Sequence, residues 1–128
     1  MRLFFMIILS LSLIQAQPTV AQELRAVYAA WIGTDDLYNS RGQRLTEPWQ
    51  ILRQDRANFH RFGIRQRGDE WDPIFHAQAA RDQFERLIRA GRIEPRARRM
   101  IVNGHAMVYV EVWGWGNRLH SVNVLVER

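Results

Sequence analysis

Cysteine is absent from the 128-residue chain, and so is lysine. Without cysteine the protein can form no disulfide, offers no thiolate to a metal and has no thiol nucleophile. A small domain of this kind has to be stable on its hydrophobic core alone. The eighteen basic residues are all arginine, whose planar guanidinium group binds carboxylate and phosphate through paired hydrogen bonds that lysine cannot make.

Several motifs of enzymes are also missing. The four histidines, at positions 60, 76, 105 and 120, have no close metal-ligand spacing. The chain contains no glycine-rich phosphate-binding loop and no Gly-x-Ser-x-Gly nucleophile motif. We therefore expect neither a bound metal nor a cofactor.

The N-terminus has the layout of a secretory leader. Arg2 precedes a run at positions 3–14 that is apolar except for two serines, and Ala21 is a small residue where a signal peptidase would cut. Twelve residues rise about 18 Å as a helix, well short of the roughly 30 Å bilayer core. The sequence therefore predicts a signal peptide over residues 1–21 and no stable membrane anchor after cleavage. An exported protein without cysteine is typical of the bacterial periplasm, so we expect a periplasmic or secreted location.

Residues 22–128 suffice for a single domain. The whole chain carries a formal net charge of +5, which suits contact with anionic polymers of the envelope, lipid headgroups or nucleic acid. The densest basic run contains Arg92, Arg96, Arg98 and Arg99. Such a run is either a solvated connector or a strip that contacts anions.

Two helices are predicted in the first two-thirds of the domain. Thr46 is expected to cap a helix that reaches Phe62 and stops at Gly63. The second helix is expected over residues 72–90, opened by Asp72 and stopped by glycine at position 91.

The remaining segments read as strands. Residues 98–102 and 105–113 are rich in β-forming residues, and the Asn-Gly pair between them predicts a hairpin. A third strand is expected over residues 118–126, and residues 24–32 could add a fourth strand from the N-terminus. The predicted fold is therefore α+β, with two helices packed on a small, mostly antiparallel sheet.

Two polar residues fall where the first helix should face the core. Asp55 lies inside the apolar stripe that Ile51 and Phe62 define, and Asn58 lies at its edge. A carboxylate aimed at a core has to be paired or hydrogen-bonded, so we expect Asp55 to tie a loop or an arginine to the helix. The alternative is a catalytic carboxyl with a raised pKa. His60, opposite the stripe, is expected to be solvated.

A possible catalytic cluster depends on the register of the last hairpin. If its turn is centred on positions 115–116, Trp113 pairs with Arg118 and Glu111 pairs with His120. These groups would form an exposed charge pair, or they would suit phosphodiester cleavage with Glu111 as base, His120 as acid and Arg118 on the phosphate. In outline the chain then resembles the small microbial guanyl-specific ribonucleases, which are exported and basic, have helices before an antiparallel sheet and use Glu, Arg and His. The resemblance covers no continuous motif.

The sequence favours a non-enzymatic interaction domain that binds an anionic envelope component or a protein partner. Its expected contact residues are the arginines of the basic run and the tryptophans of the last hairpin: Arg92, Arg96, Arg98, Arg99, Trp113 and Trp115. The alternative is a small secreted phosphodiesterase of the ribonuclease type. The oligomeric state is left open.

Overall fold

The core of the protein is a three-stranded antiparallel sheet in the order β1-β2-β3. A computed structural model describes residues 16–127, in which the strands are β1 (Glu23–Ile32), β2 (Ala106–Trp115) and β3 (Arg118–Glu127). The N-terminal strand pairs with β2, and β2 forms a hairpin with β3. The predicted N-terminal strand is therefore part of the sheet, as one of its two edges.

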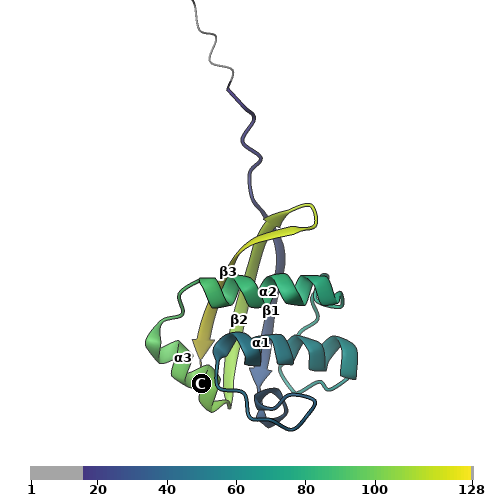
Figure 1. Cartoon of the computed structure of the whole chain (residues 1–128), viewed down its shortest axis with the longest axis vertical. Helices are drawn as coiled ribbons and strands as arrows, with labels where there is room; N and C mark the ends of the chain where they lie inside the picture. Colours follow the sequence, from purple (N-terminus) through teal and green to yellow (C-terminus); the bar gives the residue numbers. More distant parts are fainter. Residues whose placement is uncertain (1–15, 128) are drawn as a thin grey trace, which may run out of the picture.

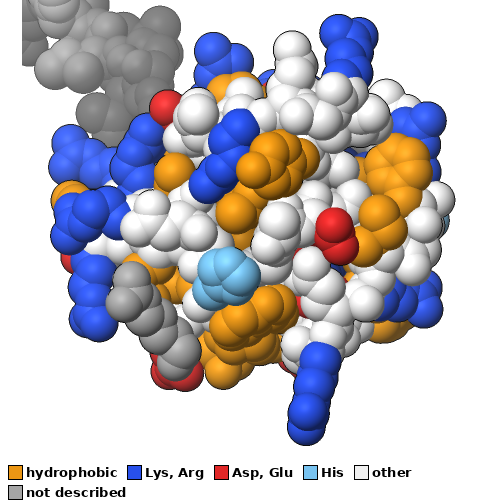
Figure 2. Space-filling model, turned by 90° about the horizontal axis from the view of Figure 1, so that it is seen from below, with side chains coloured by type: hydrophobic (Ala, Val, Ile, Leu, Met, Phe, Trp, Pro, Cys, Tyr) orange, Lys and Arg blue, Asp and Glu red, His pale blue; other side chains and the backbone are white. Residues whose placement is uncertain are grey.

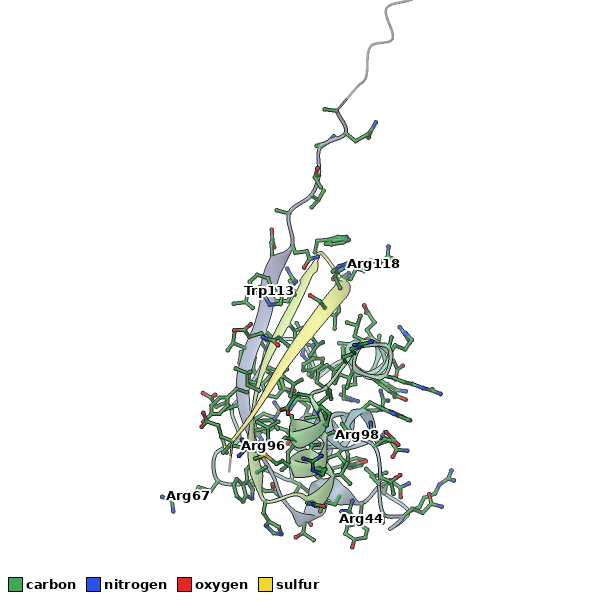
Figure 3. All side chains as sticks on the ribbon, turned by 90° about the vertical axis from the view of Figure 1, so that its left-hand side faces the viewer. Arg44, Arg67, Arg96, Arg98, Trp113 and Arg118 are labelled. Carbon is green, nitrogen blue, oxygen red and sulfur yellow. The ribbon has the colours of Figure 1, made fainter. Side chains whose placement is uncertain are left out.

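Three helices lie on one face of this sheet: α1 (Pro48–Ala57), α2 (Gln78–Ala90) and α3 (Pro95–Asn103). Figure 1 shows α1 and α2 crossing the strands and α3 beside β3. Seen along the sheet, the helices all lie on the same side of it (Figure 3). The fold is thus a two-layer α+β arrangement, and it has three helices where two were predicted.

The predicted leader falls mostly outside the described residues, because residues 1–15 are not among them. Residues 16–22 are exposed, have no regular structure and run away from the sheet (Figure 1). Within residues 16–127, every helix is too short or too polar to cross a bilayer.

Alternation along the central strand produces the core. Val108, Val110 and Val112 are completely buried against the helices, whereas Tyr109 between them faces the other way and is exposed. The same inner layer contains residues from β1 and from the helices, among them Tyr28 and Phe84. Half-buried valines of β3 complete its margin.

The prediction of a strand over residues 98–102 is wrong, because this segment belongs to α3. Pro95 occupies the first turn, where its missing N–H costs nothing, and the Glu94 carboxylate accepts the Arg96 N–H at 3.3 Å. Ala97, Met100 and Ile101 are the buried residues, at helical spacing. The Asn-Gly pair that predicted a hairpin instead ends this helix, and Gly104 leaves it with a φ of 72°.

The limits of the other helices also differ from the prediction. Glu47, rather than Thr46, is the residue before α1. The first helix ends as expected at Gly63, which is left-handed with a φ of 67°, but its last turn, Asn58–Phe62, is a π-helix. The second helix begins at Gln78 instead of Asp72, and the glycine after it has an ordinary negative φ.

The segment between α1 and α2 covers the outer edge of β1. The Glu70 N–H donates to the Ala29 carbonyl at 2.8 Å, and the Glu70 carboxylate accepts the Ala29 N–H at 2.7 Å. The Asp69 carboxylate accepts the Trp31 N–H at 2.9 Å. Because these groups are satisfied, the β1 edge is closed to a further strand from Ala29 to Trp31.

Candidate functional site

Helix α3 displays the basic run on its outer surface. Arg92 precedes the helix, and Arg96, Arg98 and Arg99 lie on it; all four are exposed. Arg98 forms an ion pair with Glu47 at 2.5 Å. The other three take part in no ion pair within the described part of the chain, so their guanidinium groups can meet a partner.

Shallow grooves run beside these arginines. Arg96 and Arg99 line one, of about 220 Å³, together with Met100 and Asn103. A second groove, of about 290 Å³, separates α3 from the C-terminal half of β3. Arg92 lines a third, of about 220 Å³, between the end of α2 and the middle of β3. Arg92 and Arg96 therefore border residues 122–127 of β3, whereas Arg99 lines only the groove on α3.

The predicted register of the β2–β3 hairpin is wrong. Trp115 pairs with Arg118, so the turn holds only two residues, and Glu111 lies opposite Asn123 instead of His120. A β-bulge at positions 113–114 makes His120 the extra residue on β3. Glu111 and His120 are thus offset by three residues, or about 10 Å along the strand.

The three candidate catalytic residues consequently do not converge. Within residues 16–127, Glu111, Arg118 and His120 share no hydrogen bond or ion pair. The His120 ring instead stacks on Trp115, with ring centres 5.1 Å apart. Trp113 and Arg118 lie at the hairpin end of the sheet, whereas Arg96 and Arg98 lie toward its other end (Figure 3). The two groups of predicted binding residues therefore form separate surfaces.

The strongest electrostatic feature is a buried cluster around Arg56. Its side chain is completely buried, and its Nε donates to the Asp55 carboxylate at 2.7 Å. One terminal nitrogen donates at 3.0 Å to both the Asp72 carboxylate and the Glu70 carbonyl. The guanidinium carbon lies 4.0 Å from the centre of the Tyr28 ring. One arginine thereby joins α1, the segment that covers β1, and β1 itself.

Asp72 accepts four hydrogen bonds. One oxygen accepts the N–H groups of Ile74 and Phe75, at 3.0 and 2.6 Å. The other lies 3.0 Å from Arg56 and 2.6 Å from the His60 ring nitrogen. The His60 side chain is only 5% exposed, contrary to its predicted solvated position. The π-helical turn explains the error, because it changes the helical phase at this residue.

The two carboxyl groups beside Arg56 differ in proton affinity. Burial raises the pKa of Asp55 to about 7, even though the Arg56 charge acts in the opposite direction. Burial also acts to raise the pKa of Asp72, but the hydrogen bonds from His60, Phe75, Ile74 and Arg56 outweigh it, and the pKa lies below its ordinary value. Asp72 is therefore the ionised partner of Arg56 at neutral pH. Asp55, with a single strong donor, gains a proton near neutrality.

Asn58 extends this polar network toward β1. It is buried, and its side-chain amide donates to the Asp36 carboxylate at 2.9 Å and to the Asp35 carbonyl. Burial raises the pKa of Asp36 to about 6. Asn58 thus joins the end of the first helix to residues 35–36, whereas Asp55 binds Arg56, the next residue on α1. Since Arg56, Asp55 and Asp72 are sealed from solvent, we assign the cluster to stabilisation of the fold.

Sequence reasoning missed Arg56 and Arg81, because an arginine in a polar helix normally faces solvent. Arg81 is 4% exposed and donates to the Phe75 and His76 carbonyls. No pattern near either residue signals its burial.

In residues 16–127 no group of three or more potential ligand side chains could hold a metal ion. Comparison with protein families, with curated proteins and with solved structures finds no match.

Proposed function

We propose that the protein is an exported interaction domain that binds an anionic partner through Arg92, Arg96 and Arg99. The observation that carries this proposal is the exposure of these three arginines beside grooves, with no carboxylate of the described chain paired to them. A guanidinium group without an internal partner is well suited to carboxylate or phosphate. Export rests on the leader predicted over residues 1–21.

The charge of the molecule supports this proposal. Figure 2 views the protein from below relative to Figure 1 and shows arginine side chains projecting around the perimeter, with far fewer acidic side chains among them. The formal net charge is +5. A field of one sign attracts an anionic partner over about 8–10 Å at physiological salt.

The alternative, a phosphodiesterase, has lost its structural support. It required Glu111, Arg118 and His120 to meet at one end of the sheet, and the observed register separates them. Trp113 and Arg118, the pairing partner of Trp115, lie at the hairpin end of the sheet, away from Arg96 and Arg98 on α3 (Figure 3). The half-buried Trp113 and Trp115 are therefore left out of the proposed contact surface. The proposal therefore rests on the arginines of the α3 region.

The experiment uses heparin as a soluble polyanion and measures its binding by fluorescence anisotropy. We expect R96Q/R99Q to weaken binding about 30-fold, since each surface arginine contributes about 1 kcal/mol to contact with an anionic surface. The control is R61Q/R67Q, which removes two exposed arginines from the end of α1 and from the segment that follows it. We expect a change of less than about threefold in the control. Equal losses in both variants would show that only net charge matters and would overturn the proposal.

A further inference from the structure

We propose that the free edge of β3 accepts an extended acidic segment of a partner polypeptide as a fourth strand. This inference rests on the proposed function and names the class of anionic partner. It arises from a difference between the two edges of the sheet. Asp69 and Glu70 cover the β1 edge at Ala29 and Trp31. On β3, the described residues provide such a cover only at Leu119, whose N–H donates to the Gln83 side chain at 3.0 Å.

The hydrogen-bonding pattern identifies the backbone groups that are free. The N–H groups of Ala29 and Trp31 point away from β2, so Tyr28, which directly precedes Ala29, bonds to its partner Val110 on β2. In an antiparallel sheet successive residues point to opposite sides, so Val110 bonds to β1 and its other neighbour, Val124, does not bond to β2. The residues of β3 whose N–H and C=O groups face outward are therefore Val122, Val124 and Val126.

These three valines have their side chains on the helix side of the sheet, packed against the margin of the core. No side chain of residues 16–127 donates to their carbonyls or accepts from their N–H groups. β3 is ten residues long and contains no proline, so nothing in its own sequence blocks pairing. An edge of this kind is a ready template for another strand.

The grooves beside the β3 edge determine which side chains of an added strand can be accommodated. Alternate side chains of a new strand would point toward the helices, where the two grooves along β3 are lined by Arg92 and Arg96 together with apolar residues such as Ile93 and Met100. Two carboxylates also line the grooves: Glu94, which accepts a backbone N–H of α3, and Glu127 at the end of β3. A segment with acidic side chains at alternate positions can pair its carboxylates with Arg92 and Arg96.

A second copy of this chain fits the edge less well. Pairing β3 with β3 of another molecule would place Arg92 and Arg96 of both copies along one junction, in a protein whose net charge is +5. Like charges brought together at an interface are unfavourable. Charge complementarity therefore favours an acidic partner over self-association.

The test uses a fluorescent nine-residue peptide of alternating glutamate and valine. A second peptide of the same sequence is N-methylated at alternate residues, which keeps its charge but removes the donors that face the edge. On the protein side, Val124→Pro removes one outward N–H without touching a bond to β2. Circular dichroism and the urea midpoint verify that this variant is folded.

We expect the wild type to bind the unmodified peptide at least tenfold more tightly than the N-methylated one. Val124→Pro should lose the same factor for the peptide while its affinity for heparin stays unchanged. If both peptides bind equally well, the arginines recognise charge alone, and the strand-addition proposal fails while the proposed function survives. The N-methylated peptide provides this answer even if Val124→Pro does not fold.

One further outcome would overturn the inference, and another would refute only the proposed function. A dimer in size-exclusion chromatography that Val124→Pro converts to a monomer would make a second copy the occupant of the edge. Unchanged affinity of R96Q/R99Q for heparin together with normal peptide binding would refute the proposed function and leave the strand edge as a site independent of those arginines.

Discussion

Replacing Asp72 with asparagine should strongly destabilise the protein, because this carboxylate holds the charge that balances Arg56. The substitution keeps the size of the side chain and removes one negative charge. Its backbone-facing oxygen can still accept the N–H groups of Ile74 and Phe75. The loss therefore concerns the contacts with Arg56 and His60, both in the interior.

The expected magnitude follows from burial. Asp72 and Arg56 are both 0% exposed as side chains, and removal of one partner from a buried ion pair typically costs 3–5 kcal/mol. Arg56 retains Asp55 at 2.7 Å, so we expect the lower end, about 3 kcal/mol. A domain of this size has a free energy of unfolding of roughly 5–15 kcal/mol. The variant should fold, but its free energy of unfolding should be much smaller than that of the wild type.

Urea unfolding at pH 7, followed by tryptophan fluorescence, measures the effect; the chain has five tryptophans as reporters. With a slope of about 2 kcal/mol per molar, the midpoint should fall by about 1.5 M. Asp82→Asn is the matched control, because Asp82 pairs with Arg53 at 2.7 Å but is 43% exposed. We expect less than about 1 kcal/mol there.

The pH dependence gives a second measure of the same residue. The pKa of Asp72 is lower in the folded protein than its ordinary value, so its ionised form stabilises the fold above about pH 4. This contribution is lost as the pH falls through the folded-state pKa, and the difference between Asp72→Asn and wild type should shrink there. Equal, small losses at Asp72 and Asp82 would refute the assignment of the buried cluster to stability.

Further outcomes test other parts of the structure. Burial raises the pKa of Asp55 to about 7. The protonated side chain therefore stabilises the fold fully below about pH 4, and this contribution declines as the pH rises to 7. In urea unfolding, Asp55→Asn should lose less stability at pH 8 than at pH 5. Gly104→Ala should cost about 2–3 kcal/mol, since its φ is 72° and a Cβ would lie 2.8 Å from Leu37; Gly42→Ala, at a φ of 74° with open space around it, should cost only about 1 kcal/mol. Mass analysis of periplasmic protein should find the chain about 21 residues shorter than its gene, and an intact N-terminal methionine in a cytoplasmic pool would contradict export.

The sequence by itself determined the features that depend on neighbouring residues. Enrichment in β-branched and aromatic residues predicted both β2 and β1. The left-handed Gly63 ended the first helix where expected. Helical spacing also placed Asp55 toward the core, where it is 1% exposed. Each of these properties follows from local composition, from local periodicity or from one residue's backbone preference, which a single sequence contains in full.

Tertiary structure decided whether residues 98–102 form a strand or a helix. Their β-branched residues and the Asn-Gly pair suit a hairpin, but Ala97, Met100 and Ile101 bury a helical face instead. Both structures satisfy the local pattern. The choice depends on packing against α1 and β3, which the segment alone does not specify.

Long-range pairing also decided the register of the last hairpin and the burial of Arg56. The two-residue turn shifts the pairing by two residues and the bulge by one more, so Glu111 lies three residues away from the position opposite His120. Arg56 is buried because Asp72, sixteen residues later, folds back onto it. The free energy that holds a charged side chain in a core comes from a partner distant in sequence, so local patterns contain no sign of it.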